Sequence, residues 1–214
     1  IDITNNIVFG NRADGITIGD EEPDYGDVRD VRVSGNLVFD NGEQGVNGGA
    51  GVTVRANVND YQIYDNAFYN NVQGLQIDGS DFQGGNKPDN GLVYQNVVAE
   101  NTFRPGLIED ATNVTLADNV FTADYTTLFT GKGGEGVENL VDLNNQQVSP
   151  EEFESVAAAG GAGEILTWSS AQDSGDSVEG VDFEAFEAIA SSREAFVDAP
   201  GAYQPRWVRE QGLV

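Results

Sequence analysis

The chain has 214 residues, of which 36 are Asp or Glu and 10 are Lys or Arg, so its formal net charge is −26 with no His present. This charge excludes a nucleic-acid-binding surface and favourable contact with an anionic membrane, and no apolar run reaches the ~18 residues of a membrane span. Because Cys and His are both absent, disulfides, a thiolate nucleophile, a Ser-His-Asp triad and the usual zinc ligands are excluded as well.

The acidic composition has two interpretations. A large net charge keeps a protein soluble but destabilises it through self-repulsion, which high salt screens. Adaptation to high salt is therefore the first interpretation. Selective binding of a cation or a cationic ligand is the second.

Asparagine recurs at intervals of 30 residues from the start of the chain. A fifth and shorter copy of the surrounding pattern, VTLADNVF, places Asn119 in the same position. Internal repeats of this length indicate a stack of similar units. The two series are Asn6, Asn36, Asn66 and Asn96, and Asn11, Asn41, Asn71 and Asn101.

Each copy predicts two or three short strands. Apolar residues alternate with outward-facing ones before the Asn, an apolar pair follows it, and a further strand opens at Gly15, Gly51, Gly74 and Gly106. One such unit cannot bury its apolar face alone, so the copies must stack. We expect each Asn to adopt a left-handed turn and to hydrogen-bond the Asn of the neighbouring coil.

This pattern resembles the right-handed parallel β-helix repeats of the pectate-lyase-like superfamily. The resemblance implies an all-β, right-handed parallel β-helix of about five coils over residues 1–130. The fold hosts polysaccharide lyases, glycoside hydrolases, epimerases, viral tailspikes and adhesins, so it does not determine an activity. It implies an extracellular protein, or one at a cell or virion surface, and the acidic composition adds the expectation of a salt-adapted organism.

Both ends of the predicted stack need partners. Ile1 already lies within a strand pattern, so we expect further N-terminal coils, a second chain or an oligomer contact there. Residues 131–214 predict a small mixed α/β cap packed on the last coil. Within it, 139–143 is a strand, and Ser149-Pro-Glu-Glu152 is a helix start with a capping box.

Two long insertions leave the same corner of the predicted coil, just after its Gly-initiated strand. They are residues 20–27 and 80–90, which belong to the first and third coils, so we expect them to flank the second coil as walls of a groove. A third insertion, 42–50, precedes the same strand of the second coil. The floor of the groove would be the outward side chains of Thr17, Thr53 and Gln76.

Arg55 is the main candidate for catalysis in this groove, predicted to lie near Asp78 and then Asp110. An Arg can bind a sugar carboxylate through two hydrogen bonds and can stabilise an enolate-like charge beside it. Lys87 and Tyr25, on the walls, are candidate bases if their pKa is lowered. The alternatives are that Arg55 only neutralises Asp78 and that Lys87 is simply exposed.

The walls also carry candidate ligands. Hard carboxylate oxygens suit Ca²⁺, which is the one cofactor suggested; no organic cofactor is expected. Solvated loops without metal are the alternative. Phe82 joins Thr53 and Gln76 as a candidate substrate contact. The candidate metal ligands are Asp20, Asp24, Asp78 and Asp81, with Asp89 close by.

Two further features have open interpretations. Tyr64 and Tyr94 share an outward position on adjacent coils, where they either contact sugar rings or stabilise the sheet as an aromatic pair. Glu109 falls where Ile77 lies one coil earlier. It is either a buried acid with a raised pKa or the sign of a register slip beside Pro105.

The sequence therefore predicts lyase-like cleavage of an acidic polysaccharide, with a hydrolase or an epimerase as related possibilities. The rival hypotheses are a non-enzymatic tailspike or adhesin and a calcium-stabilised structural solenoid. The negative charge opposes binding of an acidic polysaccharide at low salt, and this repulsion largely disappears at high salt, where the Debye length falls to ~3 Å. No nucleic acid and no membrane insertion are expected.

Overall fold

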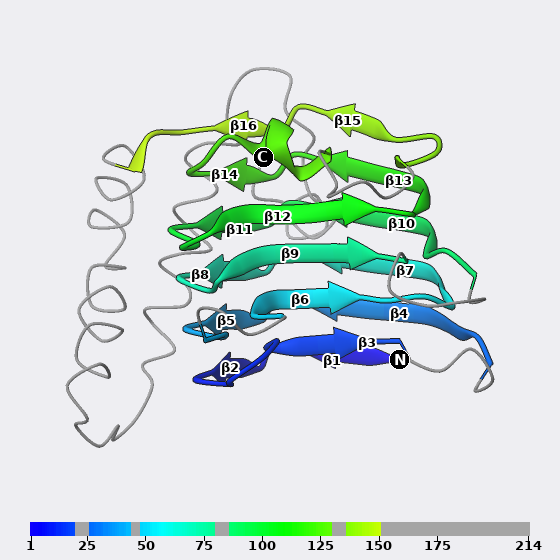
Figure 1. The fold of residues 1–214 in the computed structure, drawn as a ribbon, viewed down its shortest axis with the longest axis horizontal. Helices are drawn as coiled ribbons and strands as arrows, with labels where there is room; N and C mark the ends of the chain where they lie inside the picture. Colours follow the sequence, from blue (N-terminus) through cyan, green and yellow to red (C-terminus); the bar gives the residue numbers. More distant parts are fainter. Residues whose placement is uncertain (20–25, 44–47, 80–85, 130–135, 151–214) are drawn as a thin grey trace, which may run out of the picture.

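The structure is a computed structural model that describes residues 1–19, 26–43, 48–79, 86–129 and 136–150. These residues form a parallel β-solenoid, in which each coil stacks on the one before it (Figure 1). The all-β parallel coil stack predicted from the sequence is confirmed. Within the described part of the chain, no helix is long and apolar enough to cross a membrane.

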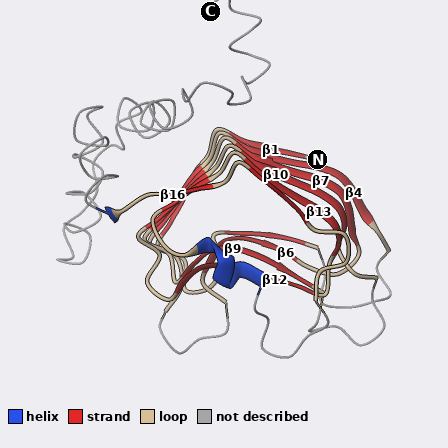
Figure 2. Ribbon diagram, turned by 90° about the horizontal axis from the view of Figure 1, so that it is seen from above, coloured by secondary structure: helices blue, strands red, loops and turns tan. Residues whose placement is uncertain are grey.

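Three parallel sheets form the walls of the solenoid (Figure 2). Sheet A contains β1 (Asp2–Thr4), β4 (Val28–Ser34), β7 (Val58–Tyr64), β10 (Asp89–Tyr94), β13 (Thr112–Ala117) and β15 (Val141–Leu143). Sheet B contains β2 (Ile7–Phe9), β5 (Leu37–Phe39), β8 (Ala67–Tyr69), β11 (Val97–Ala99), β14 (Val120–Phe121) and β16 (Gln146–Gln147). Sheet C contains β3 (Ile16–Ile18), β6 (Ala50–Val54), β9 (Gln73–Asp78) and β12 (Arg104–Glu109).

Each of the first four coils contributes one strand to every sheet. After β14, the 3-10 helix η1 (Tyr125–Phe129) takes the place of a further sheet C strand, and its Leu128 is fully buried in the core. Strands β15 and β16 then add one more row to sheets A and B. The predicted strand at 139–143 is therefore observed at Val141–Leu143. Most of the predicted cap, residues 151–214, lies outside the described residues.

The asparagine ladders form as the repeat predicts. In the first series each side-chain amide donates to the Oδ1 atom of the next Asn at 2.8–3.0 Å, from Asn6 through Asn119 to a sixth member, Asn145. The second series runs in the same way from Asn11 to Asn101. These bonds satisfy buried polar groups at two corners, and they hold successive coils in register.

The left-handed turns lie one residue earlier than the sequence suggested. Positive φ angles occur at the residues before the ladder Asn side chains, as at Asp65 (57°) and Asn70 (50°). The ladder Asn residues themselves are not left-handed among the described positions. The chain therefore turns at the preceding residue, and the Asn uses its amide to bridge coils.

The core consists of the inward residues of all three sheets. One inward row of sheet A runs through Val31, Tyr61, Gly91 and Val114. Tyr61 is fully buried, and a Cβ atom added to Gly91 would lie 2.1 Å from its Cζ atom. The Tyr61 ring thus fills space that the missing Gly91 side chain leaves on the next coil.

The sheet C register differs from the prediction in the fourth coil. Gly106 pairs with Leu75 rather than with Gly74, and Glu109 pairs with Asp78 rather than with Ile77. Pro105 takes the place equivalent to Gly74, so the coil is shifted by one residue. Since strand side chains alternate between faces, this shift turns Glu109 to the outer face. The predicted register slip is therefore observed, and Glu109 is nevertheless buried on that face, with 7% of its surface exposed.

Candidate functional site

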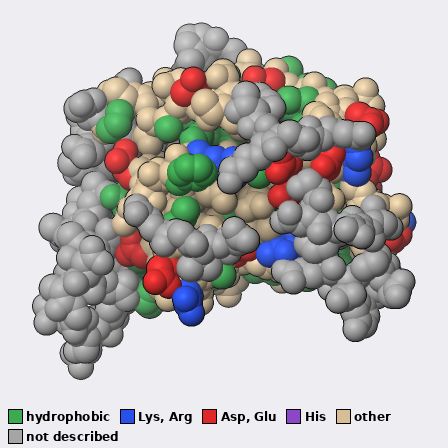
Figure 3. All heavy atoms as spheres, in the orientation of Figure 1, with side chains coloured by type: hydrophobic (Ala, Val, Ile, Leu, Met, Phe, Trp, Pro, Cys, Tyr) green, Lys and Arg blue, Asp and Glu red, His purple; other side chains and the backbone are tan. Residues whose placement is uncertain are grey.

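The outer face of sheet C carries the polar residues that the sequence singled out. Thr17 pairs with Thr53, Thr53 with Gln76, and Gln76 with Leu107, so the three predicted floor residues lie side by side on consecutive coils. In the orientation of Figure 1 this face is towards the viewer, and Figure 3 shows basic and acidic side chains together over it. This face is therefore the candidate binding surface.

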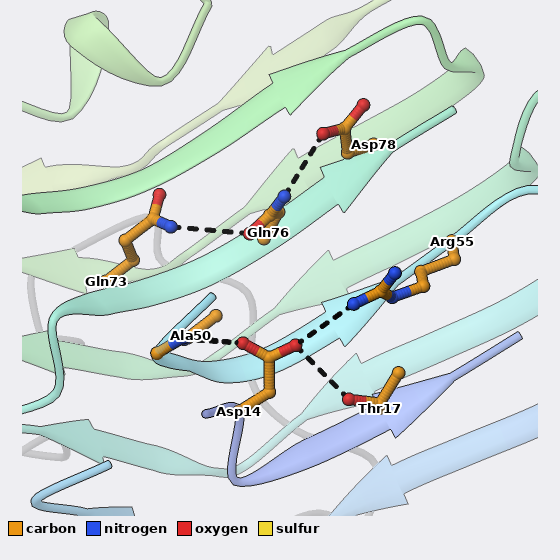
Figure 4. A network of polar contacts seen from close by, with 8 residues as sticks. Asp14, Thr17, Ala50, Arg55, Gln73, Gln76 and Asp78 are labelled. Atoms are coloured by element: carbon orange, nitrogen blue, oxygen red, sulfur yellow. Dashed lines mark hydrogen bonds and ion pairs between the residues drawn. The ribbon is translucent and has the colours of Figure 1, made fainter. Parts of the chain in front are cut away.

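Arg55 forms an ion pair with Asp14 on the neighbouring coil. The guanidinium Nη2 lies 3.7 Å from the Asp14 Oδ2 atom, and only 5% of the Asp14 side chain is exposed (Figure 4). The other carboxylate oxygen accepts the backbone N–H of Gly49 at 2.7 Å and of Ala50 at 3.0 Å, while the Thr17 hydroxyl donates to Oδ2 at 3.3 Å. Asp14 is thus a saturated acceptor that holds Arg55 against the face.

The predicted surroundings of Arg55 need one correction. By register Arg55 follows Val54, which pairs with Ile77, so Asp78 is its neighbour on the next coil as predicted. The next position along the stack is occupied by Glu109, not Asp110, because of the shift in the fourth coil. A second carboxylate therefore lies beside Asp78 on the outer face.

A second polar chain crosses the upper half of the face. The Arg104 Nε donates to the Gln73 side-chain carbonyl. The Gln73 amide donates to Gln76 at 3.3 Å, and the Gln76 amide donates to Asp78 at 3.1 Å (Figure 4). Burial lowers the pKa of Arg104, while the negative charges of Glu109 and Asp78 partly offset that effect. These contacts place a second guanidinium near two carboxylates.

Thr53 lies at the centre of the face with unused hydrogen-bonding capacity. Its side-chain oxygen is buried and makes no hydrogen bond with any residue that the structure describes, and the residue is 1% exposed. Its paired neighbours Thr17 and Gln76 both use their polar groups. A buried hydroxyl without a partner costs free energy, so it stands out in an otherwise hydrogen-bonded face.

Lys87 lies at the corner between sheets C and A, among carboxylates of later coils. Its Nζ atom is 3.8 Å from Asp110 and 3.6 Å from Glu138. An ammonium between two carboxylates is a poor proton acceptor, because both neighbours stabilise its charged form. The ion pairs with Asp110 and Glu138 therefore disfavour Lys87 as a base, and its catalytic role stays a prediction.

Several predicted site residues lie outside the described part of the chain. These are Tyr25, Phe82, Asp20, Asp24 and Asp81. The described ends of the two insertions both lie between sheets C and A, since β3 is followed by β4 and β9 by β10. That the insertions wall a groove therefore stays a prediction. Among the described residues no group of three or more carboxylates is arranged to hold a metal ion.

Tyr64 and Tyr94 lie on a different face, the outer side of sheet A. They pair in register, and their rings stack with centroids 4.9 Å apart and an interplanar angle of 11°. The predicted neighbouring position is therefore correct. Their assignment as sugar contacts stays a prediction, because stacked rings on adjacent strands also stabilise a sheet.

Asp14, Gln73 and Arg104 were not singled out from the sequence. Arg104 pairs with Gln73 and Gln73 with Ala50, so all three polar residues occupy the entrance of their sheet C strands. Polar residues at this repeated position were the available signal. It was hidden because insertions of different length change the spacing between coils.

Comparison with known proteins adds no assignment. No protein-family model, curated protein or solved structure matches the chain.

Proposed function

We propose that the protein binds an acidic polysaccharide along the outer face of sheet C and cleaves it by a lyase-type elimination. The observation that carries the proposal is the position of Arg55, which Asp14 holds at 3.7 Å beside the buried Thr53. The chain has 10 basic residues in total. Two guanidinium groups on one face of such an acidic protein support the binding of a negatively charged ligand there.

The chemistry required is limited. A base removes the proton from the carbon next to a uronate carboxyl group, and the electron pair left behind forms a double bond as the adjacent glycosidic C–O bond breaks. The leaving oxygen then takes a proton. Arg55 would stabilise the negative charge that develops on the carboxyl group, because a fixed cation in a partly desolvated site is effective there.

The base is the open element of this proposal. The predicted candidates are Tyr25, which lies outside the described residues, and Lys87, which its ion pairs with Asp110 and Glu138 disfavour. Asp14 is unsuited to the task, since its oxygens already accept two backbone N–H groups, a hydroxyl and an ion pair. If calcium is required, Asp78 is the described candidate among its ligands.

The experiment is an incubation with a panel of acidic polysaccharides at ~1 M salt, where repulsion by the protein is screened. Cleavage would appear as absorbance of an unsaturated uronate end. We expect Arg55→Ala to slow cleavage by about 100-fold or more, with partial recovery in Arg55→Lys. Arg12→Ala is the matched control, because Arg12 forms an exposed ion pair with Glu43.

The second candidate is a non-enzymatic polysaccharide-binding solenoid, favoured by the ion pairs that surround Lys87. Binding that requires Arg55 without any release of unsaturated ends would select it. Neither binding nor cleavage by the wild-type protein would exclude both candidates.

A further inference from the structure

A shallow depression crosses sheet A, away from the sheet C face. Its volume is about 310 Å³, and it extends over three consecutive coils. Val31 and Tyr61 line it although their side chains are buried, so their backbone forms its floor. One wall is formed by the row 30, 60 and 90, and the other by the row 32, 62 and 92.

Both walls point outward. Asp30 and Arg32 are both exposed on either side of the buried Val31. Asp30, Asp60 and Asn90 are all left-handed, with φ angles of 54°, 57° and 55°. The same kink thus repeats on three coils, which keeps the wall straight along the stack.

The depression offers hydrogen-bonding groups that no other described residue uses. The Gln62 side-chain amide makes no hydrogen bond with any described residue, and neither does the Asp30 carboxylate. Within the described part of the chain, the Arg32 side chain uses only Nη1, in a 3.5 Å contact with the Asp2 carboxylate. Donors and acceptors are therefore available side by side, beside the partly exposed apolar surface of Leu92.

Two tyrosine rings lie on the same side of sheet A as the depression. Tyr64 and Tyr94 follow Gln62 and Leu92 by two residues, so they face the same side of sheet A as the wall of the depression. Mixed polar groups with an apolar or aromatic contact are suited to a ring that carries hydroxyl groups on its rim and C–H groups on its faces. The volume lies at the lower end of the range for small-ligand sites, about 300 Å³.

We propose that this depression is a binding site for one or two neutral sugar units of a glycan. Asp30 and Gln62 would accept and donate hydrogen bonds to ring hydroxyls, and Leu92 would contact a ring face. An anionic sugar is disfavoured, because Asp30 and Asp60 outnumber Arg32 in the lining. A metal ion is disfavoured by Arg32 and by Asn90, which already donates to Asp60. This site is independent of the function proposed for sheet C.

The test is a titration of the ¹⁵N-labelled full chain with cellotetraose, mannotetraose, xylotetraose and maltotetraose. Binding of at least one of them should shift amide resonances of residues 30–32, 60–62 and 90–92. Gln62→Ala should weaken that binding by roughly tenfold through the lost hydrogen bonds, and Gln62→Trp should abolish it by filling the depression. Both changes are at a partly exposed strand position, and circular dichroism checks the fold.

Thr4→Ala is the control, because Thr4 is exposed on the same sheet outside the depression. It should leave the affinity unchanged. The proposal is overturned if none of the four tetrasaccharides shifts these resonances, or if Gln62→Trp binds as the wild type does. A CaCl₂ titration that shifts them in place of the glycans would overturn it as well.

Discussion

Arg55 reaches back along β6 to the carboxylate of Asp14, which also accepts the backbone N–H groups of Gly49 and Ala50 at the start of the same strand. One carboxylate of the first coil therefore holds both the entrance of β6 and the side chain that follows its end (Figure 4). The position of the guanidinium depends on this contact, so Asp14 is a positioning residue for the sheet C face.

Replacement of Asp14 should destabilise the protein as well as displace Arg55. Asp14→Ala leaves two backbone N–H groups without acceptors, so we expect the free energy of unfolding to fall by about 2–4 kcal/mol. Asp14→Asn should cost less, because its carbonyl oxygen can still accept. Urea denaturation measures the difference as a change in midpoint at constant slope.

Glu43→Ala is the comparison for this change, since the Glu43 ion pair with Arg12 is exposed. It should alter the free energy of unfolding by no more than ~0.5 kcal/mol. If Asp14→Ala were as stable as Glu43→Ala, the hydrogen bonds that Asp14 accepts at the start of β6 would not contribute to stability.

The close contact between Tyr61 and Gly91 makes a paired prediction. The Gly91 backbone is not left-handed, so only space opposes a side chain there. Gly91→Val should lower the free energy of unfolding by about 2–3 kcal/mol through overpacking against the Tyr61 ring. The double variant Tyr61→Val/Gly91→Val should recover at least half of this loss, because Val already occupies the same row at Val31 and Val114.

Thermal or urea unfolding of the two single variants and the double variant completes a double-mutant cycle. Tyr61→Phe is the control, because the Tyr61 hydroxyl is buried without a hydrogen bond to the described residues and its removal should be neutral or stabilising. Purely additive losses in the double variant would contradict the packing explanation.

The asparagine ladder should be sensitive to the identity of the amide. The Asn66 amide donates to the Oδ1 atom of Asn96 and to the carbonyls of Val33 and Tyr64, all at 2.9–3.0 Å, and Asn66 is buried. Asn66→Asp replaces those donors with a carboxylate facing three acceptors. We expect a loss of at least ~3 kcal/mol in the free energy of unfolding at neutral pH.

Asn6→Asp tests the same change at an exposed member of the ladder, where water can solvate the carboxylate. It should cost much less. Chemical denaturation of both variants supplies the comparison, and equal losses at the two positions would argue against burial as the cause.

Two carboxylates should make opposite contributions to the pH dependence of stability. Hydrogen bonds from Thr112 and Asn113 lower the pKa of Asp89, so its stabilisation is present above its unfolded pKa and is lost as pH falls through the folded value. Burial raises the pKa of Asp118, which the hydrogen bond with Asn144 only partly offsets. The folded protein therefore binds the Asp118 proton more tightly than the unfolded chain does. The stabilisation that Asp118 contributes falls as pH rises from its pKa in the unfolded chain to its higher pKa in the folded protein.

We therefore expect Asp89→Asn to be less stable than the wild type at pH 7 and Asp118→Asn to be more stable. Asn tolerates the left-handed backbone of Asp118 (φ 53°). Both differences should shrink in acid, as measured by denaturant titration between pH 7 and pH 3. The same sign for the two variants at pH 7 would contradict the assigned causes.

The net charge of −26 should make stability depend on salt. Raising the ionic strength from ~0.1 M to ~1 M shortens the Debye length from ~10 Å to ~3 Å, which screens repulsion between surface carboxylates. The thermal midpoint should rise in NaCl and to the same extent in KCl. A rise confined to one cation would indicate selective binding instead, and no rise would contradict adaptation to high salt.

The sequence repeat by itself determined the stacked coils of this protein. Equal spacing of Asn36, Asn66 and Asn96 fixes the coil length, and the alternation around them fixes which side chains point inward. The row Thr17, Thr53 and Gln76 follows from these two facts, because parallel strands in register place equivalent residues side by side. The stacked Tyr64 and Tyr94 follow in the same way.

Only the tertiary structure decided which side chains meet. Asp14 and Arg55 lie 41 positions apart and occupy different places in their coils, so no periodicity links them; the reach of a long side chain does. The outward turn of Glu109 depends on one residue of register, which the irregular length of the fourth coil conceals. Repetition specifies the backbone, whereas unequal turns and flexible side chains determine the polar contacts built on it.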